Sequence, residues 1–347
     1  MTSAARILFF MTLAVAAAGA LAGPAVTAAY SQSISPAEIA AMQRDYRRPP
    51  PRPVENAALV ALGRELFFAR ELSASGNTSC ASCHFPELGW GVREPRSRND
   101  SGKLTARKSQ PLIGTGHIAG PVGWDGRNAS LEAQARSSIA TGSMSMRETP
   151  TPVKVEVIEE RVRSNPAFVK KFAAAMPDAA INMDAIVKAI AEFERTIEPG
   201  RAPFDRWVEG DAQAISESAQ RGFALFNGKA NCFACHSGWR FTDDKFHDIG
   251  TTTTDVGRGQ VDKADELMRF AFKTPTLRSV ALRPAYMHNA SVATLHDVMK
   301  HYERGGIDRP SRSPLLTPIA LTDQERDDLV AFMDALTGAE EAAQAVR

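Results

Sequence analysis

The stretch that decides the fold is Cys80-Ala81-Ser82-Cys83-His84, which returns later as Cys232-Phe233-Ala234-Cys235-His236. These two C-x-x-C-H motifs use all four cysteines of the 347-residue chain. In such a motif the two thiols become thioethers of a c-type haem, and the adjacent histidine binds the iron. We therefore expect two covalent haem c groups, one held by Cys80, Cys83 and His84 and the other by Cys232, Cys235 and His236.

Other uses of paired cysteines fit the chain less well. A structural zinc site needs further cysteine or histidine ligands at matching spacing, and a thioredoxin-like pair needs a βαβ context. The sequence offers neither. A disulfide within each pair remains the plainer alternative, but a ring with two intervening residues is tight and strained.

The halves of the chain repeat an arrangement of helix, motif, long irregular stretch and helix. Leu59, Leu62, Leu66 and Phe67 recur at helical spacing before the first motif, and residues 221–226 echo residues 63–67 before the second. Each half ends with a helix that has one apolar face. This face is formed by Ile186, Ile190, Phe193 and Ile197 in the first half and by Leu329, Phe332, Met333 and Leu336 in the second. Thr322 and Glu325 form a capping box for the last helix, and Gly338 is its expected end. The best strand candidate is short, Val153 to Ile158, so the fold class is mainly α.

Composition narrows the function. Hydrophobic residues at 44% and charged residues at 23% are ordinary for a globular protein and argue against a disordered or multi-span membrane chain. A formal charge of +1 gives no attraction for a polyanion, so we expect no nucleic acid partner.

The N-terminus indicates export. Residues 1–29 carry Arg6, an apolar run and small-residue cleavage sites, which predicts a signal peptide and a periplasmic mature protein without a membrane span. An uncleaved anchor is the alternative, although the apolar run is short for one. Residues 30–55 form a Pro-rich leader, in which Arg47 to Pro53 cannot be helical.

Ordered motifs along the mature chain resemble the bacterial dihaem cytochrome c peroxidase family, which includes the MauG enzymes. They comprise residues 62–68 and 79–84, Trp124-Asp125-Gly126-Arg127 with Leu131 and Gln134, residues 272–278, and Tyr286-Met287-His288. The resemblance implies two cytochrome c-like haem domains that face one interface, here residues 56–200 and 201–340. The N-terminal haem would react with hydrogen peroxide, and the C-terminal haem would transfer electrons.

The resemblance also implies the second iron ligands. In the C-terminal domain the ligand is expected fourteen residues after His288, which is Tyr302, on a helix that Ser291 could cap and Gly305 would end. Met299 shares the helical face and is the alternative, whereas His301 lies off it. A phenolate favours ferric and higher oxidation states, whereas a thioether favours ferrous iron. In the N-terminal domain, Asp100 stands where many members carry a removable histidine. We therefore expect a five-coordinate iron, with His117 as a weaker candidate ligand.

Several further residues match the family. Gln134 matches the catalytic glutamine, but Met144 stands where the resemblance implies a glutamate, and Glu148 is the nearest carboxyl that could replace it. Trp124 matches the tryptophan between the haems, and Arg127 is expected to hold a haem propionate. A calcium ion between the domains is possible, although its asparagine ligand is replaced by Ser109.

Three functions follow as hypotheses. The chain is a peroxidase supplied by a small cytochrome c or cupredoxin, or a MauG-like enzyme that oxidises a protein substrate, or a dihaem electron carrier without enzymatic activity. Tyr302 and the missing distal histidine favour the second, and the missing glutamate keeps the third open.

Overall fold

A computed structural model describes residues 36–92, 94–145 and 153–338. The predicted signal peptide and Glu148 lie outside the described residues. The described residues belong to one compact unit.

The described part of the chain is mainly helical, which confirms the predicted class. The helices are α1 (Pro36–Asp45), α2 (Ala57–Phe68), α3 (Leu131–Ala140), α4 (Val155–Arg163), α5 (Pro166–Ala175), α6 (Met183–Glu194), α7 (Pro203–Val208), α8 (Glu217–Asn227), α9 (Leu295–Arg304) and α10 (Asp323–Asp334). Strands β1 (Phe246–His247) and β2 (Phe272–Lys273) pair antiparallel, with Phe246 opposite Lys273. Short 3-10 turns include η2 (Cys80–Ser82) and η5 (Cys232–Ala234).

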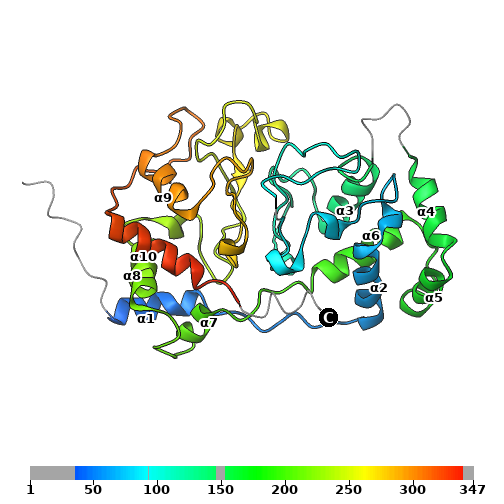
Figure 1. The fold of residues 1–347 in the computed structure, drawn as a ribbon, viewed down its shortest axis with the longest axis horizontal. Helices are drawn as coiled ribbons and strands as arrows, with labels where there is room; N and C mark the ends of the chain where they lie inside the picture. Colours follow the sequence, from blue (N-terminus) through cyan, green and yellow to red (C-terminus); the bar gives the residue numbers. More distant parts are fainter. Residues whose placement is uncertain (1–35, 93, 146–152, 339–347) are drawn as a thin grey trace, which may run out of the picture. The chain divides into compact units, whose positions relative to one another are not determined.

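Two crossed helix pairs carry the internal repeat, α2 with α6 and α8 with α10 (Figure 1). Each crossing depends on a glycine. A Cβ on Gly63 would lie 1.9 Å from the Ala189 carbonyl oxygen, and one on Gly222 would lie 2.0 Å from that of Asp328. Only a residue without a side chain permits so close a backbone approach.

Each pair lies within its own apolar core. The first core gathers Leu62, Leu66 and Phe67 of α2 with Ile186 and Ile190 of α6. The second gathers side chains of α8 and α10, among them Phe223, Phe226 and Phe332. Tyr46, just after α1, is 3% exposed and belongs to the second core. The leader therefore packs against the C-terminal half, although it precedes the N-terminal half in the sequence.

The leader after α1 has no regular structure, and two of its own arginines bind it to main-chain carbonyl oxygens elsewhere in the chain. Arg48 donates to the carbonyl oxygens of Pro199 and Gly200 at 2.8 and 3.2 Å, and Arg52 donates to that of Gly116 at 2.7 Å. The Arg48 bonds fix the leader to the segment that joins the two halves, and the Arg52 bond fixes it to a loop of the N-terminal half.

Some local predictions are wrong. Residues 155–163 form helix α4 rather than a strand, because Ile158 and Val162 are buried on one helical face. Thr294, not Ser291, caps α9 by accepting from the Asp297 amide at 3.1 Å. The last helix ends at Asp334, before Gly338, although Thr322 caps it as predicted. Helix α1 is not predicted from the sequence.

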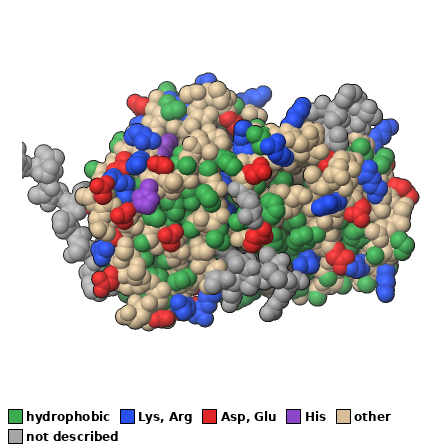
Figure 2. All heavy atoms as spheres, viewed as in Figure 1, with side chains coloured by type: hydrophobic (Ala, Val, Ile, Leu, Met, Phe, Trp, Pro, Cys, Tyr) green, Lys and Arg blue, Asp and Glu red, His purple; other side chains and the backbone are tan. Residues whose placement is uncertain are grey.

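Two further features concern the surface. No helix within the described residues has the length and apolar character needed to cross a membrane. Acidic and basic side chains are interspersed on the face drawn in Figure 2, which agrees with the near-zero net charge.

Candidate haem sites

The first C-x-x-C-H motif lines a large cavity, the N-terminal cavity, whose walls come mainly from the N-terminal half and partly from residues 240–289. Cys80 begins η2 and Cys83 directly follows it, and the Cys83 amide donates to the Cys80 carbonyl oxygen at 3.1 Å. Nδ1 of His84 lies 3.2 Å from the Trp90 carbonyl oxygen. The cavity encloses about 2680 Å³ of empty space, part of it open to solvent, and Cys80, Cys83 and His84 all line it.

The second motif repeats this geometry. On η5 the Cys235 amide donates to the Cys232 carbonyl oxygen at 3.2 Å, and Nδ1 of His236 lies 2.8 Å from the Phe241 carbonyl oxygen. The C-terminal cavity, lined by Cys232, Cys235 and His236, has about 1630 Å³ of empty space, part of it open to solvent, and mostly apolar walls.

The side chains of both cavities fit a c-type haem. All four cysteines are free thiols, so the disulfide alternative is not found. Burial lowers the pKa of both His84 and His236, which favours the neutral form of each imidazole. A carbonyl at Nδ1 fixes the proton there and gives Nε2 the lone pair that a metal needs. Arg240 is also among the residues that line the N-terminal cavity, and its buried Nε has no hydrogen-bond partner.

Tyr302 and Met299 both line the C-terminal cavity from α9. The Tyr302 hydroxyl has no hydrogen-bond partner among the described residues. Burial raises its pKa, and the nearby sulfurs of Cys232 and Cys235 add to that rise. His301 is turned away, with Nε2 at 2.8 Å from the Ile249 carbonyl oxygen.

Gln134 lies on α3 and lines the N-terminal cavity. Its Oε1 accepts from Asn128 at 2.6 Å, and its Nε2 donates to Ser138 at 3.3 Å, so the amide orientation is fixed. Met144 is 5% exposed and lines the same cavity. His117 is bound elsewhere, with Nε2 at 2.7 Å from Glu198 and its ring against Trp239.

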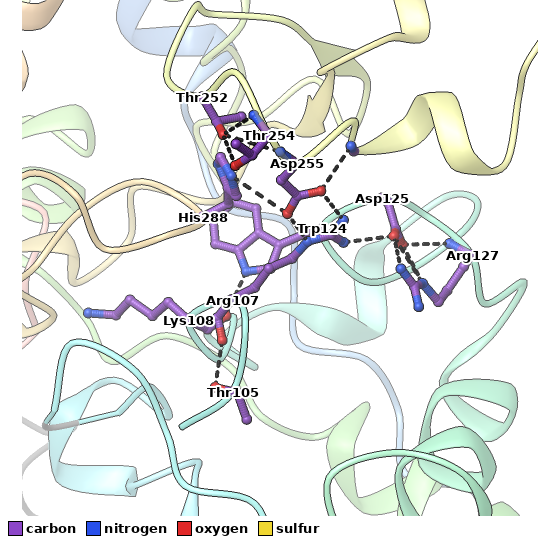
Figure 3. A network of polar contacts seen from close by, with 11 residues as sticks. Thr105, Arg107, Lys108, Trp124, Asp125, Arg127, Thr252, Thr254, Asp255 and His288 are labelled. Carbon is purple, nitrogen blue, oxygen red and sulfur yellow. Dashed lines mark hydrogen bonds and ion pairs between the residues drawn. The ribbon is translucent and has the colours of Figure 1, made fainter. Parts of the chain in front are cut away.

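Trp124 lines both cavities, and so does His288. The indole Nε1 donates to the Lys108 carbonyl oxygen at 2.7 Å, and the Trp124 and His288 rings lie 6.3 Å apart (Figure 3). The His288 ring also stacks on Phe272 at 3.5 Å. Burial lowers the pKa of His288 to about 4, so its imidazole is neutral at physiological pH.

A charged network beside Trp124 joins the two halves. Arg107 binds both oxygens of Asp255 at 2.7 Å and also binds Asp125 at 2.7 Å (Figure 3). Arg127, the expected propionate ligand, is bound to Asp125. Burial alone would raise the pKa of Asp125, but the bonds from Arg127 and Arg107 lower it to about 2.

Comparison with known proteins identifies the family. Residues 57–213 match the model of the di-haem cytochrome c peroxidase family, and residues 219–337 match that of cytochrome c. Methylamine utilization protein MauG of Methylorubrum extorquens is 42% identical over 310 residues, 86% of this chain and 85% of the relative. Cytochrome-c peroxidase IdrP1 of Denitromonas iodatirespirans is 36% identical, over 83% of this chain and 85% of the relative. This chain belongs to the di-haem cytochrome c peroxidase family.

A solved structure has the same fold. The crystal structure of a MauG-like protein associated with microbial copper homeostasis superposes with a TM-score of 0.75 at 28% identity, covering 86% of this chain and 95% of that one. The two cytochrome c-like domains and the two covalent haem c groups are thus confirmed. Relatives named as peroxidases and as MauG make the chain a dihaem enzyme and do not support the electron-carrier alternative.

Ser109, which replaces the expected asparagine ligand of a calcium ion, lies among polar contacts. The Ser109 and Ser97 hydroxyls pair at 2.7 Å, and the neighbouring Lys108 ammonium donates to the carbonyl oxygens of residues 283, 284 and 285 at 3.0, 2.8 and 2.7 Å. The Lys108 ammonium thus already occupies three nearby carbonyl oxygens, the kind of ligand that calcium prefers, and a calcium ion between the domains stays a prediction. Among the described residues, three potential metal ligands gather only at Cys235, Asp243 and His247, which includes a haem-attachment cysteine.

Sequence reasoning missed the roles of Arg107, Lys108 and Asp255. They lie in irregular segments without periodicity, and Arg107 and Asp255 are 148 positions apart. The one available signal was two consecutive basic residues ahead of Pro111 in a long loop that lacks helical or strand patterning.

Proposed function

We propose that this chain is an exported dihaem enzyme that reduces hydrogen peroxide in its N-terminal cavity with electrons that pass through the C-terminal half. The difference between the cavities carries this proposal. The C-terminal cavity presents the unpartnered hydroxyl of Tyr302, whereas the N-terminal cavity presents the fixed amide of Gln134. Export to the periplasm rests on the signal peptide predicted in residues 1–29.

The bound haem supplies an iron that exchanges electrons with peroxide and with the electron donor. His84 would bind the iron of the N-terminal haem and His236 that of the C-terminal haem, because the Nδ1 of each imidazole is fixed by a carbonyl. Tyr302 would be a second ligand in the C-terminal site. Its phenolic oxygen can turn to an iron without breaking an existing hydrogen bond among the described residues.

Gln134 would orient peroxide. Its amide is held by Asn128 and Ser138, so it adds little reorganisation cost when a polar substrate enters. Trp124 would carry charge between the halves, since it lines both cavities and its indole is fixed by the Lys108 carbonyl.

The source of the electrons separates two versions of this function. In one, a small cytochrome c or cupredoxin donates them, and in the other they come from side chains of a protein substrate. The similarity to proteins named MauG, together with Tyr302 on α9, favours the protein substrate.

Electron paramagnetic resonance of the oxidised holoprotein tests the proposal. We expect one high-spin signal from the N-terminal site and one low-spin signal from the C-terminal site. Stoichiometric peroxide should abolish the high-spin signal. If the oxidised state then persists, the result supports the protein-oxidising version. If the high-spin signal returns rapidly when a reduced cytochrome is present, the result supports the peroxidase version. Two low-spin signals that do not respond to peroxide would refute both.

A further inference from the structure

The N-terminal cavity lacks the proton-transfer group expected at position 144. Met144 lines the cavity there, and a thioether carries no exchangeable proton. Reduction of peroxide to water needs protons delivered close to the oxygen that leaves. Among the described residues, four carboxyl side chains line this cavity: Asp125, Glu194, Asp244 and Asp255.

The three aspartates are occupied by ion pairs. Asp125 and Asp255 each bind Arg107 at 2.7 Å, and Asp244 binds Arg240 at 2.6 Å. Burial opposes ionisation, but the arginine bonds keep the pKa of both Asp125 and Asp255 below the ordinary value. An ion-paired carboxylate of low pKa is a poor proton donor near neutral pH.

Glu194 differs from all three. It is 8% exposed, and its carboxyl makes no hydrogen bond or ion pair with any described residue. Its oxygens are not among the sealed, unpartnered polar atoms, so they face the open cavity. The pKa of Glu194 is raised to about 8, mainly because the carboxyl is buried. The charge of Arg195 lowers this pKa by a smaller amount, and the charge of Glu132 raises it further. The Arg195 guanidinium is itself bound to Glu132 at 2.6 Å and Glu192 at 3.0 Å.

Rigid elements hold Glu194 in place. It is the last residue of α6, which Gly63 allows to pack directly against α2. Thr115 donates its hydroxyl to the Glu194 carbonyl oxygen at 2.8 Å. Helix α3, which carries Gln134, packs on α6 through Leu131 and Ala191. Glu194 and Gln134 therefore project into one cavity from two packed helices.

We propose that Glu194 is the acid and base of the peroxide reaction, in the role that the residue at position 144 cannot perform. The inference rests on the proposed function. Peroxide takes up two electrons from the reduced redox partner and two protons, its O–O bond breaks, and two water molecules form. Glu194 donates one of these protons to the departing oxygen and recovers it from solvent.

The test compares Glu194→Gln with Glu194→Asp in the holoprotein. We expect Glu194→Gln to slow the reaction with peroxide about 100-fold, and Glu194→Asp to restore part of the rate. Glu192→Gln, on the same helix but paired at the surface with Arg195, is the matched control and should react like the unchanged protein. The haem absorbance of each variant verifies folding and maturation.

Infrared spectroscopy gives a readout that does not depend on turnover. At pH 7 the unchanged protein should show the carbonyl stretch of a protonated carboxyl, and Glu194→Gln should lack it. If the Glu194→Gln variant reacts at the original rate, or if the unchanged protein lacks this band, the role assigned to Glu194 is refuted and the proposed function is not. If the unchanged holoprotein does not react with peroxide, the proposed function fails and the role of Glu194 fails with it.

Discussion

At the residue scale, Tyr302 decides what the C-terminal site can do. Its hydroxyl has no hydrogen-bond partner among the described residues, and the side chain lines the cavity that Cys232 and Cys235 also line. Tyr302→Phe should abolish the low-spin signal of the C-terminal haem and leave the high-spin signal of the N-terminal haem unchanged. Met299→Leu removes the competing thioether from the same helical face and should change neither signal. If only Met299→Leu altered the spectrum, methionine would be the ligand.

Asp125 links single-residue electrostatics to acid stability. Because its pKa is about 2 in the folded chain against 3.8 ordinarily, it stabilises the fold fully above about pH 4. That stabilisation is lost as the pH falls from about 4 to 2, and linkage puts it at about 2 kcal/mol. Asp125→Asn should lower the free energy of unfolding by about this amount at pH 7 and by much less at pH 2. Urea unfolding at both values measures it.

The matched control for this measurement is Asp184→Asn. Asp184 binds Arg136 at the surface, where its side chain is 87% exposed. Such a pair contributes less than about 1 kcal/mol because water and salt screen it. Equal losses for the two variants at pH 7 would contradict a special role for the buried Asp125.

At the scale of elements, the two glycine crossings are the points where the fold tolerates least change. Gly222→Ala would place a methyl group 2.0 Å from the Asp328 carbonyl oxygen and force α8 and α10 apart. We expect a loss of about 3 kcal/mol, at the upper end for overpacking a core. Thermal unfolding of the holoprotein measures the loss. Ala61→Ser, on the exposed face of α2, is the control, and a similar Tm for both variants would refute the crossing argument.

The sequence predicts those elements whose apolar residues recur at helical spacing. The spacing placed α2, α6 and α10 within a few residues, because each buries one face against its partner helix. It failed at α4, where Val153, Val155 and Val157 alternate like a strand although Val157 is 46% exposed. The motifs also located both haem-attachment turns. Contacts between loops far apart in sequence, such as Arg107 with Asp255, leave no periodic signal. The domain boundary near residue 200 stays a prediction.

At the scale of the whole molecule, polar contacts couple the two halves. Lys108 binds three carbonyl oxygens of residues 283–285, and Arg258 donates to the Asp125 and Gly126 carbonyl oxygens at 3.1 and 2.8 Å. The Lys273 amide donates to the Trp124 carbonyl oxygen at 2.8 Å. These contacts surround Trp124, so the residue that would carry charge between the halves is held from both of them.

The bidentate pair of Arg107 and Asp255 should carry much of this coupling. Arg107→Lys keeps the charge but loses the paired donors that match a carboxylate, so we expect the holoprotein to lose about 2 kcal/mol. A double-mutant cycle with Asp255→Asn should give a coupling energy above about 1 kcal/mol, since the groups are in direct contact. Arg163→Lys, at an exposed pair within one half, should leave the free energy of unfolding nearly unchanged, because water and salt screen such a pair. A coupling energy near zero would mean that the other contacts around Trp124 hold the halves together without this pair.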